Sequence, residues 1–152
     1  MYERTLRGAF EAAAAGRTDE WIDAFLSSGV GANLPMAVGL KKQRRWWIGP
    51  VLMPLDQFKR IAGPEPEMEF RCTRESWDAD VRTIMALDLE NLPPVIAEYV
   101  GRATLRLCDG SHRHEASLRR GRKGVWTLVW CNTESDFLTA NAMFGCIDRG
   151  RP

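Results

Sequence analysis

Hydrophobic residues recur at helical spacing in the first third of the chain. Leu6, Phe10 and Ala13 lie on one face of a predicted helix. A helix start at Thr18 precedes an apolar face over residues 21–26, and a third helix is predicted over residues 34–43. This part of the sequence therefore predicts a helical segment.

The pattern becomes mixed after Pro50. Residues 51–53 predict a short strand, and residues 55–61 predict a helix that ends at Gly63 and Pro64. Residues 67–72 alternate between polar and apolar, which is typical of a half-buried strand. An amphipathic helix is predicted to start near Thr73 or Ser76 and to carry Trp77, Val81, Ile84 and Met85.

Strands and helices also alternate in the last third. Residues 95–100 and 103–107 predict a hairpin across the Gly101-Arg102 link. A helix capped by Asp109 or Ser111 is expected to run to about Arg120, then a strand over 125–130 and a short helix over 137–144. The order of elements predicts a mixed α/β fold.

Length and composition favour one domain. A chain of 152 residues with 45% hydrophobic residues can bury a sizeable core. We expect a helical extension over residues 1–45, packed on a compact core over residues 46–152. Four widely spaced cysteines predict reduced thiols, and the absence of a long apolar run or a secretory pattern predicts a cytoplasmic protein without a membrane partner.

Two basic runs stand out against a net charge of +1. Residues 119–123 lie at the end of a predicted helix, where cations favour its dipole. The other run, residues 41–45, is the nucleic-acid candidate. Its cations can neutralise phosphates, and the neighbouring Trp46 and Trp47 can stack on bases. A solvated face is the commoner explanation of such runs. The candidate cations are Lys41, Lys42, Arg44 and Arg45.

The strongest candidate for chemistry is the corner Asp109-Gly110-Ser111-His112-Arg113. It lies between a predicted strand and helix, where glycine permits close approach and the first helical amides attract anions. Arg113 offers a forked donor for phosphate, His112 can change protonation near neutral pH, and Asp109 can act as a base or bind Mg²⁺. A plain helix cap with surface imidazoles, including His114, is the structural alternative.

The segment DGSHRHEAS resembles the D-G-x-H-R-x-x-A motif of the ParB/sulfiredoxin-like superfamily. Residues 49–55 are similar to the strand and Pro-Leu entry of that fold, and residues 93–96 are similar to its Pro-Pro-(Val/Ile) strand. The resemblance covers roughly residues 46–131. It implies a ParB/sulfiredoxin-like domain with extra N-terminal helices.

Members of this superfamily differ at the motif. Sulfiredoxins carry their reactive cysteine where this chain has Ser111, so peroxiredoxin repair is disfavoured. ParB proteins bind CTP and use a helix-turn-helix domain, for which residues 131–152 are too few, so a partition role is also disfavoured. The motif is most similar to stand-alone members such as free-serine kinases and ATP-hydrolysing, DNA-nicking oncogenic-suppression proteins. No serine pocket is identified.

The resemblance implies that the polar reactive residues are Asp109, His112 and Arg113. It also implies that the phosphate is held by the backbone amides of Gly110 and Ser111. A second carboxylate could come from residues 65–69, with Glu67 or Glu69 preferred, although a solvated acidic strand face is the commoner role of such residues. The predicted function is hydrolysis or transfer of the γ-phosphate of ATP or CTP with Mg²⁺. The alternatives are a DNA-binding or DNA-cleaving factor and a nucleotide-gated interaction switch; the oligomeric state stays open.

Overall fold

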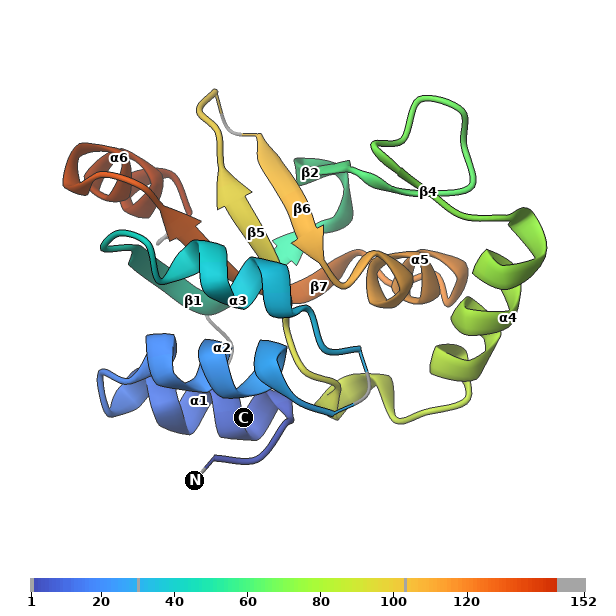
Figure 1. Ribbon diagram of the computed structural model, residues 1–152, viewed down its shortest axis with the longest axis horizontal. Coiled ribbons are helices and arrows are strands. Elements are labelled where there is room, and N and C mark those ends of the chain that lie inside the picture. Colours follow the sequence, from blue (N-terminus) through green and yellow to red (C-terminus); the bar gives the residue numbers. More distant parts are fainter. Residues whose placement is uncertain (1, 30, 103, 145–152) are drawn as a thin grey trace.

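The computed structural model describes residues 2–29, 31–102 and 104–144. The described chain combines helices with a mixed β-sheet, so the predicted α/β class is confirmed. The three N-terminal helices lie together, and the remaining helices follow strands (Figure 1). The helices are α1 (Leu6–Ala14), α2 (Thr18–Ser27), α3 (Leu34–Leu40), α4 (Arg74–Met85), α5 (Ser111–Arg119) and α6 (Glu134–Phe144), with 3-10 turns η1 (Leu55–Gln57) and η2 (Leu89–Asn91).

A five-stranded mixed sheet forms the centre, in the order β1-β7-β5-β6-β2. Strand β7 pairs antiparallel with β1 and parallel with β5, while β6 pairs antiparallel with β5 and parallel with β2. Strands β3 and β4 form a separate parallel pair. The strands are β1 (Trp46–Pro54), β2 (Phe58–Arg60), β3 (Ala62–Gly63), β4 (Phe70–Arg71), β5 (Val95–Tyr99), β6 (Leu105–Asp109) and β7 (Gly124–Cys131).

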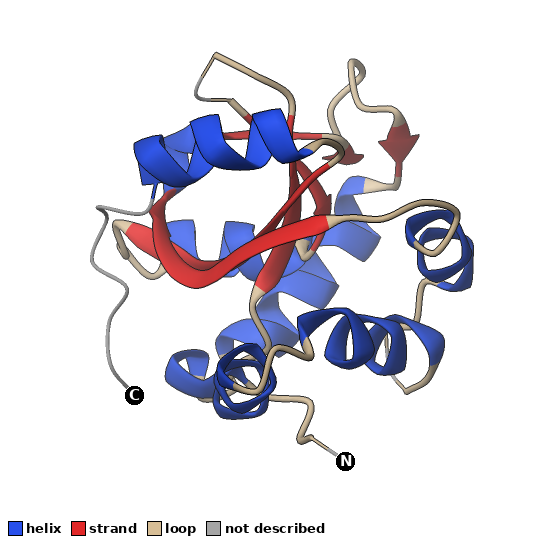
Figure 2. Cartoon of the chain, turned by 90° about the vertical axis from the view of Figure 1, so that its left-hand side faces the viewer, coloured by secondary structure: helices blue, strands red, loops and turns tan. Residues whose placement is uncertain are grey.

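Helices cover both faces of the sheet. Successive side chains of a strand point to opposite faces, and each face of this sheet carries buried apolar side chains. Helices α1–α3 cover one face, where Ile22 and Leu26 share an apolar cluster with Ile96 and Leu128. Helix α6 covers the other face, which includes Met53. Figure 2 shows helices on both sides of the twisted strands. The expected boundary at residue 45 stays a prediction.

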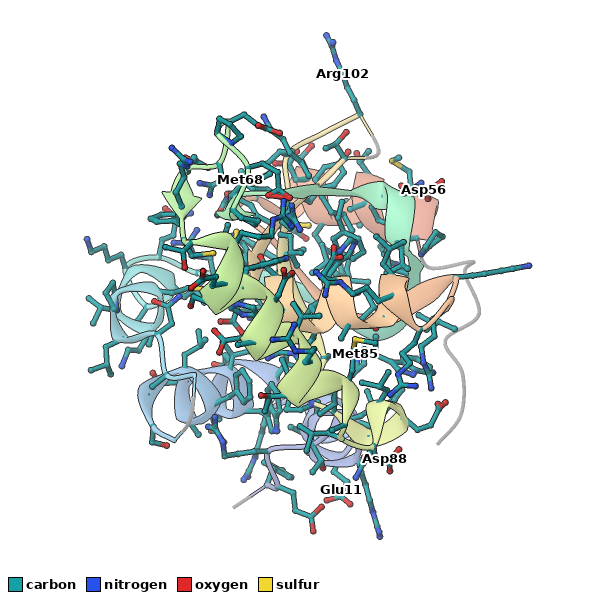
Figure 3. All side chains as sticks on the ribbon, turned by 90° about the vertical axis from the view of Figure 1, so that its right-hand side faces the viewer. Glu11, Asp56, Met68, Met85, Asp88 and Arg102 are labelled. Atoms are coloured by element: carbon teal, nitrogen blue, oxygen red, sulfur yellow. The ribbon has the colours of Figure 1, made fainter. Side chains whose placement is uncertain are left out.

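Helices α4 and α5 pack against each other beside the sheet. Trp77 and Val81 of α4 are buried against Ala116 of α5. The Thr73 side chain accepts a hydrogen bond from the Ser76 amide and caps α4. In Figure 3, α4 runs from below the loop marked by Met68 towards Met85.

The structure corrects two predicted elements. Residues 55–61 do not form a helix, because β2 instead completes the sheet by parallel pairing with β6. Residues 67–72 were predicted as a strand, but only Phe70 and Arg71 pair, and Phe70 is 62% exposed. In both places tertiary pairing overrides the local apolar spacing.

Other predicted elements are confirmed with shifted ends. The hairpin of β5 and β6 forms with antiparallel pairing, although residue 103 lies outside the described residues. Helix α6 begins at Glu134, three residues before its predicted start. Cys146, one of the predicted reduced thiols, also lies outside the described residues, and across the residues that are described no helix is long and apolar enough to cross a membrane.

Candidate functional site

Gly110 makes the turn from β6 into α5. Its φ of +103° is one that side chains rarely adopt, and an added Cβ would lie 2.6 Å from Val95 Cγ1. The Gly110 carbonyl accepts the first hydrogen bond of α5 from the His114 amide, at 2.9 Å. Within the described chain, the amides of residues 111–113 have no backbone partner. The positive end of the helix therefore keeps three donors for an anion.

Asp109 and Arg113 bracket this turn and bind each other. The Arg113 Nη2 lies 3.1 Å from Asp109 Oδ2, and the two side chains are only 16% and 13% exposed. The same nitrogen donates to the Pro94 carbonyl at 3.1 Å, and the guanidinium carbon lies 5.5 Å from the centre of the Phe25 ring. The pair uses only Arg113 Nη2 and Asp109 Oδ2, and Arg113 Nε is buried without a hydrogen-bond partner among the described residues.

His112 lies at the more open side of the same turn. Its side chain is 39% exposed, its ring centre lies 4.7 Å from that of Trp77, and its Nε2 lies 3.6 Å from Asp80 Oδ2. Partial burial lowers the pKa of His112, although the Asp80 carboxylate opposes that shift. His112 is therefore neutral at pH 7 and can accept a proton.

His114 points to a different neighbourhood. Its Nε2 lies 3.0 Å from the Leu55 carbonyl oxygen, and its ring contacts Phe58 edge to face. Its Nδ1 is buried without a hydrogen-bond partner among the described residues. Burial lowers the pKa of His114, so the imidazole is neutral and supports the packing of α5 on η1 and β2.

The three glutamates of the 65–69 loop have different surroundings. Glu67 is exposed and makes no ion pair with the described residues. Glu69 pairs with Arg106 at 3.0 Å. Glu65 pairs with Arg60, which also lies 3.4 Å from Glu115 of α5. Glu65 is therefore the loop carboxylate linked to the helix of the site, whereas sequence reasoning preferred Glu67 or Glu69.

Sequence reasoning missed the residues that surround His112. The helical pattern identified Trp77 only as a core position, and nothing in the sequence marked Asp80 or Arg60. In the structure, the Arg60 guanidinium carbon lies 4.6 Å from the Trp77 ring centre, while His112 lies against the same indole. Only the packing of α4 on α5 brings these side chains together, so no local signal could have found them.

The residues at the turn do not fit a metal ion held by the protein. The Asp109 carboxylate, the predicted Mg²⁺ ligand, is engaged by Arg113. Among the residues that the structure describes, no group of three His, Cys, Asp or Glu side chains could hold a metal ion. Any Mg²⁺ would have to arrive on the phosphates of a substrate.

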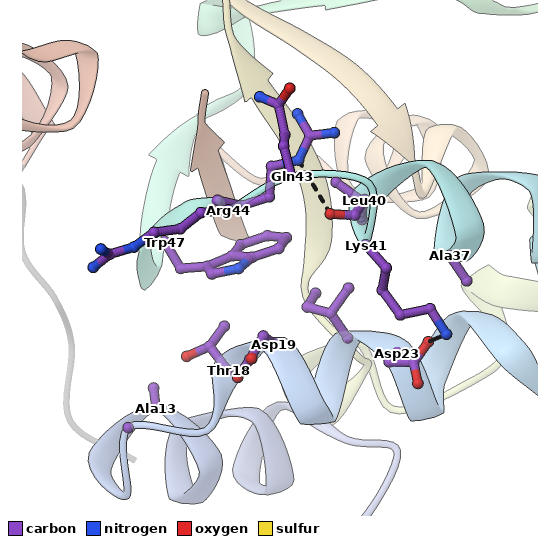
Figure 4. A pocket seen from close by; sticks show the side chains of 13 residues that line it. Ala13, Thr18, Asp19, Asp23, Ala37, Leu40, Lys41, Gln43, Arg44 and Trp47 are labelled. Carbon is purple, nitrogen blue, oxygen red and sulfur yellow. Dashed lines mark hydrogen bonds and ion pairs between the residues drawn. The ribbon is translucent and has the colours of Figure 1, made fainter. Parts of the chain in front are cut away.

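The cations of the basic run at residues 41–45 differ in their surroundings, since Arg45 is partly buried and Lys41, Lys42 and Arg44 are exposed. Arg45 donates to the Leu40 and Gly39 carbonyls at 3.2 and 2.9 Å and to Asn132. Lys41 reaches Asp23 at 3.0 Å, as Figure 4 shows at the edge of a 710 Å³ cavity between this run and α2. The Arg44 guanidinium carbon lies 4.6 Å from the centre of the Trp46 ring. Of the four candidate cations, Arg45 therefore stabilises the connection from α3 to β1, whereas Lys41 forms an exposed ion pair with α2.

Cys108 is the cysteine nearest to the turn. Burial raises its pKa to about 11, so the thiol is protonated at neutral pH. A protonated thiol is a poor nucleophile. Cys108 is therefore not a candidate nucleophile at this turn.

Comparison with known proteins found matches among solved structures alone. No family model and no curated protein match this sequence. The solved structures that are similar include the following two. A sulfiredoxin from Arabidopsis thaliana shares 20% identity with a TM-score of 0.39, and the match covers 62% of this chain and 94% of that one. The C-terminally truncated chromosome-partitioning protein ParB from Caulobacter crescentus, complexed with CTP-gamma-S, shares 17% identity with a TM-score of 0.38.

One structure is a sulfiredoxin and the other is a ParB protein, and these two groups give their names to the superfamily whose D-G-x-H-R-x-x-A motif residues 109–116 resemble. The ParB match covers 72% of this chain and 56% of the ParB chain, so this chain spans little more than half of that structure. At such identities and TM-scores, no residue role passes from either protein to this chain.

Proposed function

We propose that this chain binds the phosphates of a nucleoside triphosphate at the start of α5 and transfers or hydrolyses the γ-phosphate. The observation that carries the proposal is the turn itself, where Gly110 leaves room and the amides of residues 111–113 have no backbone partner within the described chain. Such a helix start binds anions through its amides and its dipole. We expect the substrate to be ATP or CTP.

His112 is the proton acceptor in this proposal. The oxygen of water or of an acceptor hydroxyl attacks the γ-phosphorus and gives its proton to the neutral imidazole. The bond from the γ-phosphorus to the β–γ bridging oxygen breaks, and the nucleoside diphosphate leaves. Asp80, whose Oδ2 lies 3.6 Å from His112 Nε2, stabilises the imidazolium that forms.

Asp109 and Arg113 act as positioning residues in the same proposal. Their ion pair and the bond from Arg113 to the Pro94 carbonyl attach the first turn of α5 to the start of β5. The amide donors are thereby held in place before substrate binds, which is what electrostatic catalysis needs. Mg²⁺ would enter only with the nucleotide, and no step runs through a metal ion held by the protein.

The test is phosphate release from ATP, CTP and GTP with Mg²⁺, for the unmodified chain and for His112→Ala. We expect turnover to fall about 100-fold or more in the variant, since a lost general base costs this much. Triphosphate affinity, measured by calorimetry, should change little. Lys123→Ala, which removes a cation beyond the far end of α5, is the control and should keep full turnover.

Two results would overturn the proposal: full turnover in His112→Ala, or no binding of any triphosphate by the unmodified chain. Binding without turnover in the unmodified chain would instead favour the alternative of a nucleotide-gated switch. The DNA alternative is weaker for Arg45, whose guanidinium donates to the Leu40 and Gly39 carbonyls, whereas the Lys41 side chain is exposed.

A further inference from the structure

A cavity of about 740 Å³ lies beside the candidate site, between α3, β6 and the β3–β4 pair. Its walls include Met36, Ile61, Phe70, Cys108 and Trp130. Cys108 directly precedes Asp109, so one wall of the cavity is the strand that leads into the turn. In Figure 1, the end of β6 leads directly into α5. A ligand could therefore reach from this cavity to the Gly110 turn.

One wall of the cavity carries a donor without an acceptor. Trp130 is only 6% exposed, and its indole Nε1 has no hydrogen-bond partner among the described residues. Buried indole N–H groups usually find a partner, because an unpaired donor away from water is costly. A ligand that presents an acceptor in this cavity would remove that cost.

Another wall carries an exposed aromatic ring. Phe70 is 62% exposed although it lies in a β-strand, and its neighbours in the cavity lining include the apolar side chains of Met36 and Ile61. Large exposed aromatic side chains beside a cavity favour stacking with planar ligands. The size of the cavity is in the range of small-molecule sites.

The remaining wall offers charged donors and acceptors in fixed positions. Arg106 lies 3.7 Å from Glu98 and 3.0 Å from Glu69. The Asn132 amide donates to Glu98 at 2.8 Å, which holds the carboxylate in place. A flat ring whose edge carries both donors and acceptors, as nucleobases do, complements such a wall.

We infer that this cavity binds the nucleobase of the nucleotide, with the Trp130 indole donating to the ring and Phe70 stacking on it. The inference rests on the proposed function for its link to the Gly110 turn, where the phosphates would lie. The cavity itself is lined by a separate set of residues, which come mainly from α3, β3, β4, β5, β6 and β7. Base and phosphate binding can therefore be tested apart.

The test is calorimetry of the full chain with three probes: free nucleosides (adenosine, cytidine and guanosine), inorganic tripolyphosphate, and the matching triphosphates. Trp130→Phe keeps an aromatic ring but removes the N–H donor. We expect it to weaken nucleoside and triphosphate binding about three- to tenfold, as loss of one hydrogen bond does, and to leave tripolyphosphate binding unchanged. Trp126→Phe, on the same strand but outside the cavity lining, is the control.

A second variant avoids the buried core. Phe70→Ala should weaken nucleoside binding about tenfold through lost stacking, while Leu138→Ala, which removes an equally exposed side chain on α6, should not. Nucleosides that do not bind, or that bind both cavity variants as tightly as the unmodified chain, would overturn the inference. If tripolyphosphate still binds in that case, the proposed function stands. Nucleoside binding that is sensitive to both variants, without tripolyphosphate binding, would support the cavity and overturn the phosphate site.

Discussion

Gly110 shows how one residue sets the geometry of the candidate site. Its left-handed backbone turns the chain directly from β6 into α5, and its missing side chain leaves space beside Val95 and Arg113. An added Cβ would lie 2.9 Å from Arg113 Nη2, the atom that binds Asp109 and Pro94. The shape of the turn and the ion pair beside it are therefore coupled at a single position.

Gly110→Ala should lower both stability and phosphate affinity. The strained φ and the collision with Val95 and Arg113 are expected to cost about 1–3 kcal/mol in the free energy of unfolding. Gly121→Ala is a matched control, because Gly121 also has a positive φ, +71°, but has open space around it. Urea unfolding and calorimetry with tripolyphosphate measure the two effects. Equal losses in the two variants would contradict the role of the missing side chain at Gly110.

His114 predicts a pH dependence of stability. Its folded pKa lies below the ordinary value of 6.5, so the unfolded chain binds the proton first as the pH falls. The contribution of neutral His114 is complete above pH 6.5 and is lost as the pH falls towards the folded pKa. His114→Gln removes this titration, so its free energy of unfolding should change less between pH 7.5 and 5.5, as measured by urea unfolding at each pH. His112 shifts in the same direction and remains in both proteins. Parallel curves would rule out this origin of the pH dependence.

At the scale of elements, the same apolar spacing supports different structures. Leu55, Phe58 and Ile61 recur at helical intervals, yet β2 forms there because β6 offers an open edge for parallel pairing. The basic run at 41–45 is similarly ambiguous, since charge alone cannot distinguish a phosphate contact from an internal one. In the structure, Arg45 ties the end of α3 to Asn132 beyond β7.

Arg45→Ala should therefore destabilise the fold without a specific effect on nucleic-acid binding. We expect a loss of about 1.5–3 kcal/mol in the free energy of unfolding, the range for hydrogen bonds to a charged group. Lys42→Ala, at an exposed neighbouring position, should change stability by less than about 0.5 kcal/mol. Chemical unfolding and a DNA-binding titration at two salt concentrations distinguish the roles. Unchanged stability with a reduced salt slope would favour the DNA alternative instead.

At the scale of the whole molecule, the N-terminal helices and the sheet share one core. Ile22 and Leu26 of α2 lie in the same cluster as Ile96 and Leu128 of the central strands. The candidate site depends on this arrangement, because Phe25 of α2 lies against Arg113. Helices that the sequence predicted as an extension thus contribute to the surroundings of the α5 turn.

Ile22→Ala should consequently destabilise the whole described fold. Ile22 is 2% exposed, and its truncation is expected to cost about 2–5 kcal/mol through lost burial and a cavity. Helical circular dichroism and tryptophan fluorescence should report one unfolding transition, shifted to the same midpoint by both probes. Leu138→Ala, at a 62% exposed position, is the control. Two separate transitions would show that α1–α3 unfold independently of the sheet.

The sequence by itself determined the fold class, most of the helices and the hairpin, because these depend on local apolar spacing and on turn residues such as Gly101 and Gly110. It also located the turn at residues 109–113 as the main candidate for chemistry. Only the tertiary structure decided the distant partners of the other candidate residues: His112 lies on Trp77, and Arg45 binds Asn132. These contacts join residues 35 and 87 positions apart along the chain. The preference for one partner over another arises from packing and burial, which local sequence patterns do not encode.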